Sequence, residues 1–285
     1  MTNPTPPPGR EAPQTSQTSQ TPKPLEAPTR FRDLMAAEWI KTRSLRSTPW
    51  TVALTLLFVV GSAVAATASD HHTRPGPADF LPYDAYPPAG SWTLILVAGS
   101  VGALTVVSEY STGLVRATTV AVPARGSVVL AKAVVTAVLW TAVGTIASAG
   151  SFLASQAVLN ERHAGVPITH PGVLRALTAT ALLAPVCALV GLGLGVLLRH
   201  SAATMVAAVF LLLVLPPMFS ERVRWAADVR HAMVSSAWSR LVQSWDPDPV
   251  SLAYSPTVAG SWAVYVLWPL LAVALAVLVV RRRDV

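Results

Sequence analysis

Residues 91–147 read SWTLILVAGSVGALTVV, then SEYSTGLVRATTVAVPARGSVVLAK, then AVVTAVLWTAVGTIA. The first and third parts are apolar enough to lie in lipid. The middle part, residues 108–132, carries Glu109, Arg116, Arg125 and Lys132 and is interrupted by Pro123. Because charged side chains are costly inside a bilayer, this stretch predicts two membrane-spanning helices joined by a charged segment outside the lipid.

The composition of the whole chain supports a membrane protein. Of its 285 residues 52% are hydrophobic and only 12% are charged, with a mean hydropathy of +0.50. A soluble domain usually carries about 25% charged residues, so the apolar surface of this chain must be covered by lipid. The single cysteine, Cys187, cannot form an intrachain disulfide.

Six apolar stretches are long enough to cross a bilayer core of ~30 Å as helices, which takes about 20 residues each. None of them shows the strict alternation of a barrel strand. The predicted fold is therefore an all-α integral membrane protein with six transmembrane helices. The predicted spans are residues 50–69, 90–108, 129–157, 173–198, 201–219 and 259–280.

The distribution of Lys and Arg predicts the orientation in the membrane. If the N-terminus is cytoplasmic, two thirds of the 21 Lys and Arg residues fall in cytoplasmic segments, as the positive-inside rule requires. We therefore expect a multi-pass protein of the cell membrane with both termini in the cytoplasm. The net charge of +7 is explained by anchoring to an anionic leaflet and calls for no nucleic acid.

The N-terminal region divides into a tail and a helix. Residues 1–28 are rich in Pro, Thr, Gln and Ser and are predicted to form a disordered cytoplasmic tail, which leaves 29–285 as the transmembrane domain. Residues 30–47 place most of their apolar side chains within an arc of about 140° on a helix, with Ile40 as the misfit. These side chains are Phe31, Leu34, Met35, Trp39 and Leu45.

This pattern predicts an elbow helix in the membrane interface, although a solvated juxtamembrane helix is an open alternative. The predicted interfacial anchors are Phe31, Trp39, Lys41 and, at the start of the third span, Lys132.

The segment 220–258 repeats apolar residues at every fourth position from Trp225 to Trp245. One or two amphipathic helices on the outer leaflet would bury this stripe, and packing against the ends of the spans would do so equally well. In the Pro-rich loop 70–90, Asp70, His71 and His72 are adjacent, and adjacent residues rarely converge on one metal ion. No metal site is predicted there.

The chain lacks the residue patterns of several function classes. The predicted span centres contain no Asp, Glu, Lys, Arg or His, which argues against an ion-coupled transporter and an intramembrane enzyme. No phosphate-binding loop is found. We therefore predict no catalytic residue and no bound cofactor. Glycines such as Gly99, Gly102 and the alternating run from Gly191 to Gly195 are read as close helix packing, with a flexible point as the alternative.

Residues 109–132 read E-Y-S-T-G-L-V-R-A-T-x-x-A-V-P-A-R-G-x-V-x-x-A-K. This pattern resembles the second intracellular loop of ATP-binding-cassette type-2 exporter permeases, in which an acidic residue closes the second span and a Thr-Gly pair, a short helix and a Pro-x-Arg turn follow. Leu114 departs from the pattern, because a threonine is common there. The order of elbow helix, six spans and helical outer segment is similar too.

The resemblance implies that loop 109–127 is a coupling helix that docks on a separate ATPase subunit. Leu114, Thr118 and Val122 form an apolar stripe suited to a groove. The residues implied in ATPase coupling are Glu109, Thr112, Gly113, Leu114, Arg116, Thr118, Val122, Pro123 and Arg125.

The expected function is that of the permease subunit of an ATP-driven exporter. ATP and Mg would be bound by the partner ATPase, and a second permease chain, identical or different, would complete the path. An apolar membrane centre favours an amphipathic or hydrophobic substrate such as a drug, an antibiotic or a lipid. The alternative is a membrane anchor or sensor that recruits a cytosolic partner and transports nothing.

Overall fold

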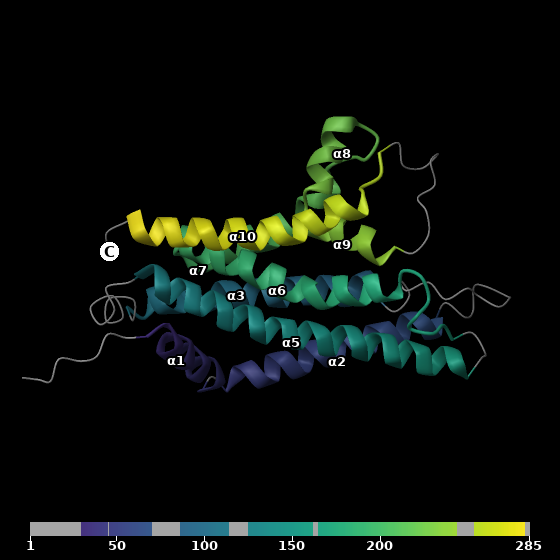
Figure 1. Ribbon diagram of the computed structural model, residues 1–285, viewed down its shortest axis with the longest axis horizontal. Helices are drawn as coiled ribbons and strands as arrows, with labels where there is room; N and C mark the ends of the chain where they lie inside the picture. The colour runs from purple at the N-terminus through teal and green to yellow at the C-terminus, as the bar shows by residue number, and fades with distance from the viewer. Residues whose placement is uncertain are drawn as a thin grey trace, which may run out of the picture.

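A computed structural model describes residues 30–44, 46–69, 86–113, 125–161, 165–243 and 254–282, and all regular elements in these ranges are helical (Figure 1). Several predicted features lie outside the described residues. They are the tail 1–28, most of the loop 70–90, and Leu114, Arg116, Thr118, Val122 and Pro123. The elements are α1 (Phe31–Ser44), α2 (Ser47–Ser69), α3 (Pro88–Ser111), α5 (Arg125–Asn160), α6 (Val173–Leu198), α7 (Ser201–Val209), η3 (Phe210–Val214), η4 (Pro216–Met218), α8 (Arg224–His231), α9 (Val234–Val242) and α10 (Val258–Arg282).

Among the described residues, five helices are long and apolar enough to cross a membrane: α2, α3, α5, α6 and α10. They agree with five of the six predicted spans, and α6 has the predicted bounds 173–198. Long apolar helices of this kind are those of a membrane-embedded protein. Helix α6 lies at the centre of the bundle and packs against α3, α5 and α10, whereas few residues of α2 and α10 are buried.

The sixth predicted span, 201–219, does not form one long α-helix. The apolar helix there runs from Ser201 to Val214, which is about 21 Å at the helical rise of ~1.5 Å per residue. Its last turn is a π-helix, Phe210–Val214, and Pro216 opens a short 3-10 turn. Proline removes a backbone donor and ends the regular helix. The described residues therefore hold five candidate spans and one shorter apolar helix.

One end of the bundle, here called the α1 end, gathers segments far apart in the sequence (Figure 1). Lys41 on α1 contacts Glu109 near the end of α3, and Gly126 at the start of α5 lies against Arg281 at the end of α10. Arg199, just after α6, stacks over the Tyr110 ring with 5.0 Å to its centroid. Helices α1, α3, α5, α6 and α10 therefore all have one end here.

The segment 200–243 returns the chain from the α1 end to the opposite end. There Arg175, in the first turn of α6, donates hydrogen bonds to the carbonyl oxygens of Leu241 and Gln243 at the end of α9. Trp238 of α9 is buried and donates to Thr180 Oγ1 at 3.2 Å. The apolar stripe of this segment is thus split between α8 and α9, and α9 packs into the bundle, as the packing alternative requires.

Close packing between α3 and α6 depends on small residues. A methyl group on Gly191 would overlap the carbonyl oxygen of Gly99, and one on Gly102 would overlap that of Ala188. Small residues let helix backbones approach closely, so the glycines of α3 and α6 serve packing. Gly61 on α2 has open space around its Cα.

We predict that Gly191→Ala destabilises the protein by ~1–3 kcal/mol, because the added methyl group forces two backbones apart. Gly61→Ala is the matched control, with a melting temperature unchanged or raised, since alanine is the better helix former. Melting of both variants in the same detergent checks this. Equal melting temperatures for the two variants would contradict the packing role of Gly191.

Candidate functional site

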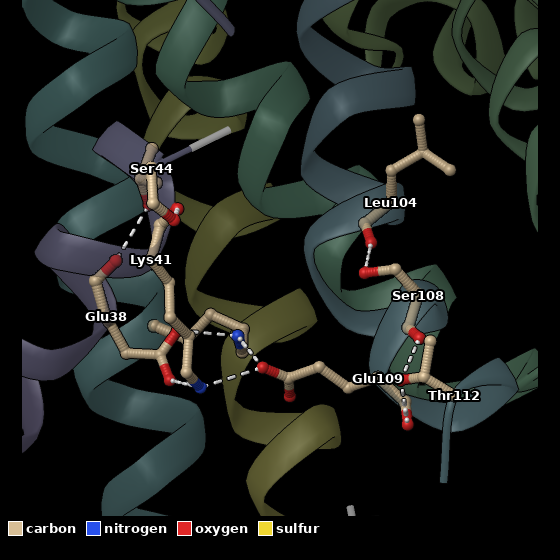
Figure 2. Close-up of polar contacts among 9 residues, drawn as sticks. Glu38, Lys41, Ser44, Leu104, Ser108, Glu109 and Thr112 are labelled. Carbon is tan, nitrogen blue, oxygen red and sulfur yellow. Dashed lines mark hydrogen bonds and ion pairs between the residues drawn. The ribbon is translucent and has the colours of Figure 1, made fainter. Parts of the chain in front are cut away.

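Four charged side chains from three helices meet at the α1 end (Figure 2). Lys41 Nζ donates to Glu38 Oε1 at 2.6 Å and to Glu109 Oε1 at 3.0 Å. Lys132 Nζ donates to Glu38 Oε2 at 2.6 Å and to Glu109 Oε1 at 2.9 Å. Each lysine thus contacts both glutamates, and the group, called the ion tetrad below, joins α1, α3 and α5 with no net charge.

The ion tetrad is largely withdrawn from solvent. The exposed fraction of the side chain is 8% for both Glu38 and Lys132, 14% for Glu109 and 39% for Lys41. An isolated charge in such surroundings would lose several kcal/mol of hydration. Alternating the two signs at hydrogen-bonding distance offsets that cost, so the four side chains are expected to act as one unit.

The neighbours of Glu38 and Lys41 set their proton affinities. Burial acts to raise the pKa of Glu38, but the charges and hydrogen bonds of Lys132 and Lys41 outweigh it, so its pKa lies below the ordinary value. Burial acts to lower the pKa of Lys41, but its bonds to Glu38 and Glu109 outweigh it, and its pKa lies above the ordinary value. Both groups are therefore charged at neutral pH.

A partly open cavity of about 290 Å³ lies between α1, the start of α2, α3 and α5, and the ion tetrad forms part of its wall. Hydroxyl groups form a second part of the wall, and apolar side chains form a third. The hydroxyl-bearing residues are Thr42, Ser44, Thr48, Thr105, Ser108, Thr112 and Thr136, and the apolar ones are Val101, Val135, Leu139 and Trp140. The cavity is therefore amphipathic.

The end of α3 has a defined cap. Thr112 donates from its backbone N–H and its hydroxyl to the carbonyl oxygen of Ser108, at 3.1 and 2.8 Å. Gly113 follows with a φ of 70°, a left-handed conformation that glycine adopts without strain and that commonly ends a helix. The Thr-Gly pair of the sequence pattern is thus the point where α3 stops.

The predicted site residues fall into three groups. Glu109, Thr112 and Gly113 lie together at the end of α3, next to Lys41. Arg125 begins α5, with its side chain outside the described residues, as are the other five predicted coupling residues. Phe31 and Trp39 are exposed on α1.

Lys132 lies elsewhere than expected. It was predicted to reach lipid headgroups, but its ammonium group is buried between Glu38 and Glu109. The reason is electrostatic, since two carboxylates within 3 Å offset the cost of burying its ammonium group.

Glu38 is the residue that sequence reasoning missed. It lies on the protein-facing side of α1 with the half-buried Leu34 and Met35. A glutamate three residues before Lys41 is a local signal for an ion pair. Its buried partner Lys132, however, is 94 positions away in the chain, and no local pattern points to it.

Comparisons with known proteins do not identify the chain. It matches no protein-family model and no curated protein. Within the described ranges, no group of three or more His, Cys, Asp or Glu side chains is placed to hold a metal ion. The ion tetrad and its cavity are the candidate site on geometry alone.

We predict that Lys132→Met lowers the free energy of unfolding by ~3–5 kcal/mol, because it leaves two buried carboxylates with one ammonium group. Adding Glu38→Gln should recover part of this loss, and the double-mutant cycle measures the coupling. Arg32→Met is the control, since Arg32 makes only an exposed pair with Asp33, which is worth ~0–1 kcal/mol. A Lys132 variant as stable as the Arg32 variant would contradict the buried network.

The ion tetrad also predicts how stability depends on pH. The lowered pKa of Glu38 stabilises the fold above about pH 4.3, the ordinary glutamate pKa, and this contribution is lost as pH falls through the folded-state pKa. The raised pKa of Lys41 stabilises the fold below about pH 10.4, and this contribution is lost as pH rises through its folded-state pKa.

Melting temperatures measured across this range should show a plateau between the two limits. The difference between the unaltered chain and Glu38→Gln should shrink as the pH falls below about 4. A constant difference down to pH 3 would show that Glu38 does not gain stability from its charge.

Proposed function

We propose that this chain is the membrane-spanning permease subunit of an ATP-driven exporter, similar to ATP-binding-cassette type-2 permeases. The observation that carries the proposal is the ion tetrad. It ties Glu109, with which the charged loop begins, and Lys132, which follows the loop, to each other and to α1. A loop that only connects two spans has no need of such an attachment.

The attachment suits a loop that receives force. A push on residues 114–124 acts on the end of α3 and the start of α5, and Glu109 and Lys132 are linked at 2.9 Å. Glu38 and Lys41 extend the link to α1, which lies at the membrane interface in this proposal. The three helices would therefore move together when a partner protein presses on the loop.

The path of the chain is compatible with six crossings. The start of α2 and the end of α10 lie at the same end of the bundle (Figure 1), so the segment from His200 to Gln243 makes the remaining traverse. In the proposal, Ser201–Val214 with η4 is the fifth crossing, helped by α9. Both termini are then cytoplasmic, where Arg281 and Arg282 of α10 meet the headgroups.

The energy for transport would come from ATP hydrolysis on a partner protein. The chain has no phosphate-binding loop in its sequence, so ATP and Mg would be bound by a separate ATPase subunit, and the permease would not be an enzyme. Two permease chains, identical or different, would enclose the path. The five long apolar helices favour an amphipathic or hydrophobic substrate such as a drug, an antibiotic or a lipid.

Co-purification from the native membrane, followed by mass measurement of the intact complex, tests the proposal. We expect two permease chains with two ATPase chains. Leu114→Asp places a charge in the predicted apolar stripe and should reduce ATPase recovery about tenfold or more, because a buried interface does not tolerate an unpaired charge. Ile168→Asp is the matched control at the opposite end of the bundle, where Ile168 is exposed.

Two outcomes would count against export. Recovery of a kinase or another regulator in place of an ATPase would favour a membrane anchor or sensor. Equal ATPase recovery with Leu114→Asp and Ile168→Asp would show that the loop does not contact the ATPase at Leu114.

A further inference from the structure

The cavity beside the ion tetrad has the chemistry of a lipid-binding site. At the α1 end, Glu109 lies two residues before the last residue of α3, and Lys132 lies seven residues after the start of α5. Helix α5 has 36 residues, about 54 Å at ~1.5 Å per residue, which exceeds a hydrocarbon core of ~30 Å. At least one end of α5 therefore reaches beyond the hydrocarbon core, and Arg125 and Lys132 near its start favour that end for the depth of the phospholipid headgroups.

The polar wall of the cavity offers acceptors. Ser108 Oγ already donates to the carbonyl oxygen of Leu104 at 2.7 Å, and Thr105 Oγ1 donates to that of Gly102 at 2.7 Å. On α1, Thr42 donates to the Glu38 carbonyl oxygen in the same way. Each of these hydroxyls has used its one donor and presents lone pairs, which the carboxylate of Glu109 supplements. A ligand rich in N–H donors fits this wall.

The same cavity has one accessible cation and an apolar part. The side chain of Lys41 is the most exposed of the ion tetrad, and an ammonium group binds phosphate well. Val101, Val135 and Leu139 line the apolar part. Among the described residues of the lining, Trp140 is the one aromatic residue, so these residues form no aromatic cage that would favour a quaternary ammonium group.

We propose that this cavity binds a phospholipid of the same leaflet as α1 whose headgroup carries a primary ammonium group, as phosphatidylethanolamine does. The ammonium group meets Glu109 and the hydroxyl oxygens of α3, the phosphate meets Lys41, and the first acyl carbons meet Val101 and Leu139. The proposal is independent of export, because it holds equally for a chain that transports nothing.

Native mass spectrometry of the delipidated full-length chain tests the site. The chain is titrated with phosphatidylethanolamine, phosphatidylcholine and phosphatidylglycerol that carry identical acyl chains. We expect phosphatidylethanolamine to bind about tenfold more tightly than phosphatidylcholine, since the quaternary headgroup has lost every charge-assisted N–H donor. Equal affinity for these two lipids, or tighter binding of phosphatidylglycerol, would overturn the proposal.

Two matched variants localise the binding. Val101→Phe fills the apolar part of the cavity and should abolish the preference for phosphatidylethanolamine. Val138→Phe adds the same bulk on α5, where Val138 is exposed and does not line the cavity, and should leave the preference intact. Retention of the preference in Val101→Phe would place the lipid elsewhere.

A third variant keeps the test decisive if Val101→Phe does not fold. Ser108 is exposed on α3 and lines the cavity, so Ser108→Leu blocks the polar wall without disturbing the core. If the melting temperature shows that Val101→Phe has not folded, loss of the preference in Ser108→Leu supports the site. Its retention there rejects the site.

Discussion

The buried ammonium group of Lys132 is the constraint on which the α1 end depends. A lysine at this depth requires negative partners, and the two that it finds come from different helices, Glu38 on α1 and Glu109 on α3. Meeting that requirement holds α1 and the end of α3 against the first turns of α5. The position of an otherwise exposed helix, α1, thus follows from one side chain of α5.

A different kind of contact holds the rest of the bundle. Lipid is as apolar as leucine, so burying leucine against another helix gains little there, and close approach of backbones matters more. Gly191 against Gly99 and Gly102 against Ala188 provide that approach between α3 and α6. Isolated polar contacts also orient the helices toward one another. For example, Tyr265 Oη on α10 donates to the carbonyl oxygen of Ala179 on α6 at 3.1 Å. The ion tetrad and the glycine contacts therefore both act on α3, one at its end and one at its middle.

The sequence predicted the parts of the fold that depend on local composition. Helix α6 keeps its predicted bounds because polar or glycine residues flank a run that is apolar apart from Arg175, Thr178 and Thr180, with Gly172 and Arg199 both left-handed at its ends. The predicted span 201–219 does not form one regular α-helix, because Phe210–Val214 widens into a π-helix before Pro216, and hydropathy does not register such a change. On α1, periodicity placed Phe31 and Trp39 on the side that faces the membrane interface, and both are exposed. It did not mark Glu38, which lies on the side packed on the protein. Glu38 pairs with Lys132, 94 positions away. This contact depends on the tertiary fold, and the spacing of residues along the chain does not predict it.

The candidate site has a buried pair, Glu38 and Lys132, and a more exposed pair, Lys41 and Glu109. The two pairs differ in what else they can bind. Glu38 and Lys132 are nearly excluded from solvent and satisfy each other at 2.6 Å, so they hold α1 on α5. Lys41 and Glu109 are more exposed and border the cavity, so the same two residues can meet a further polar group without leaving the network. A headgroup bound there would touch Glu109, the charged residue with which loop 109–127 begins. If the proposed lipid and the proposed partner both bind, lipid in the cavity and force on the loop act through one carboxylate.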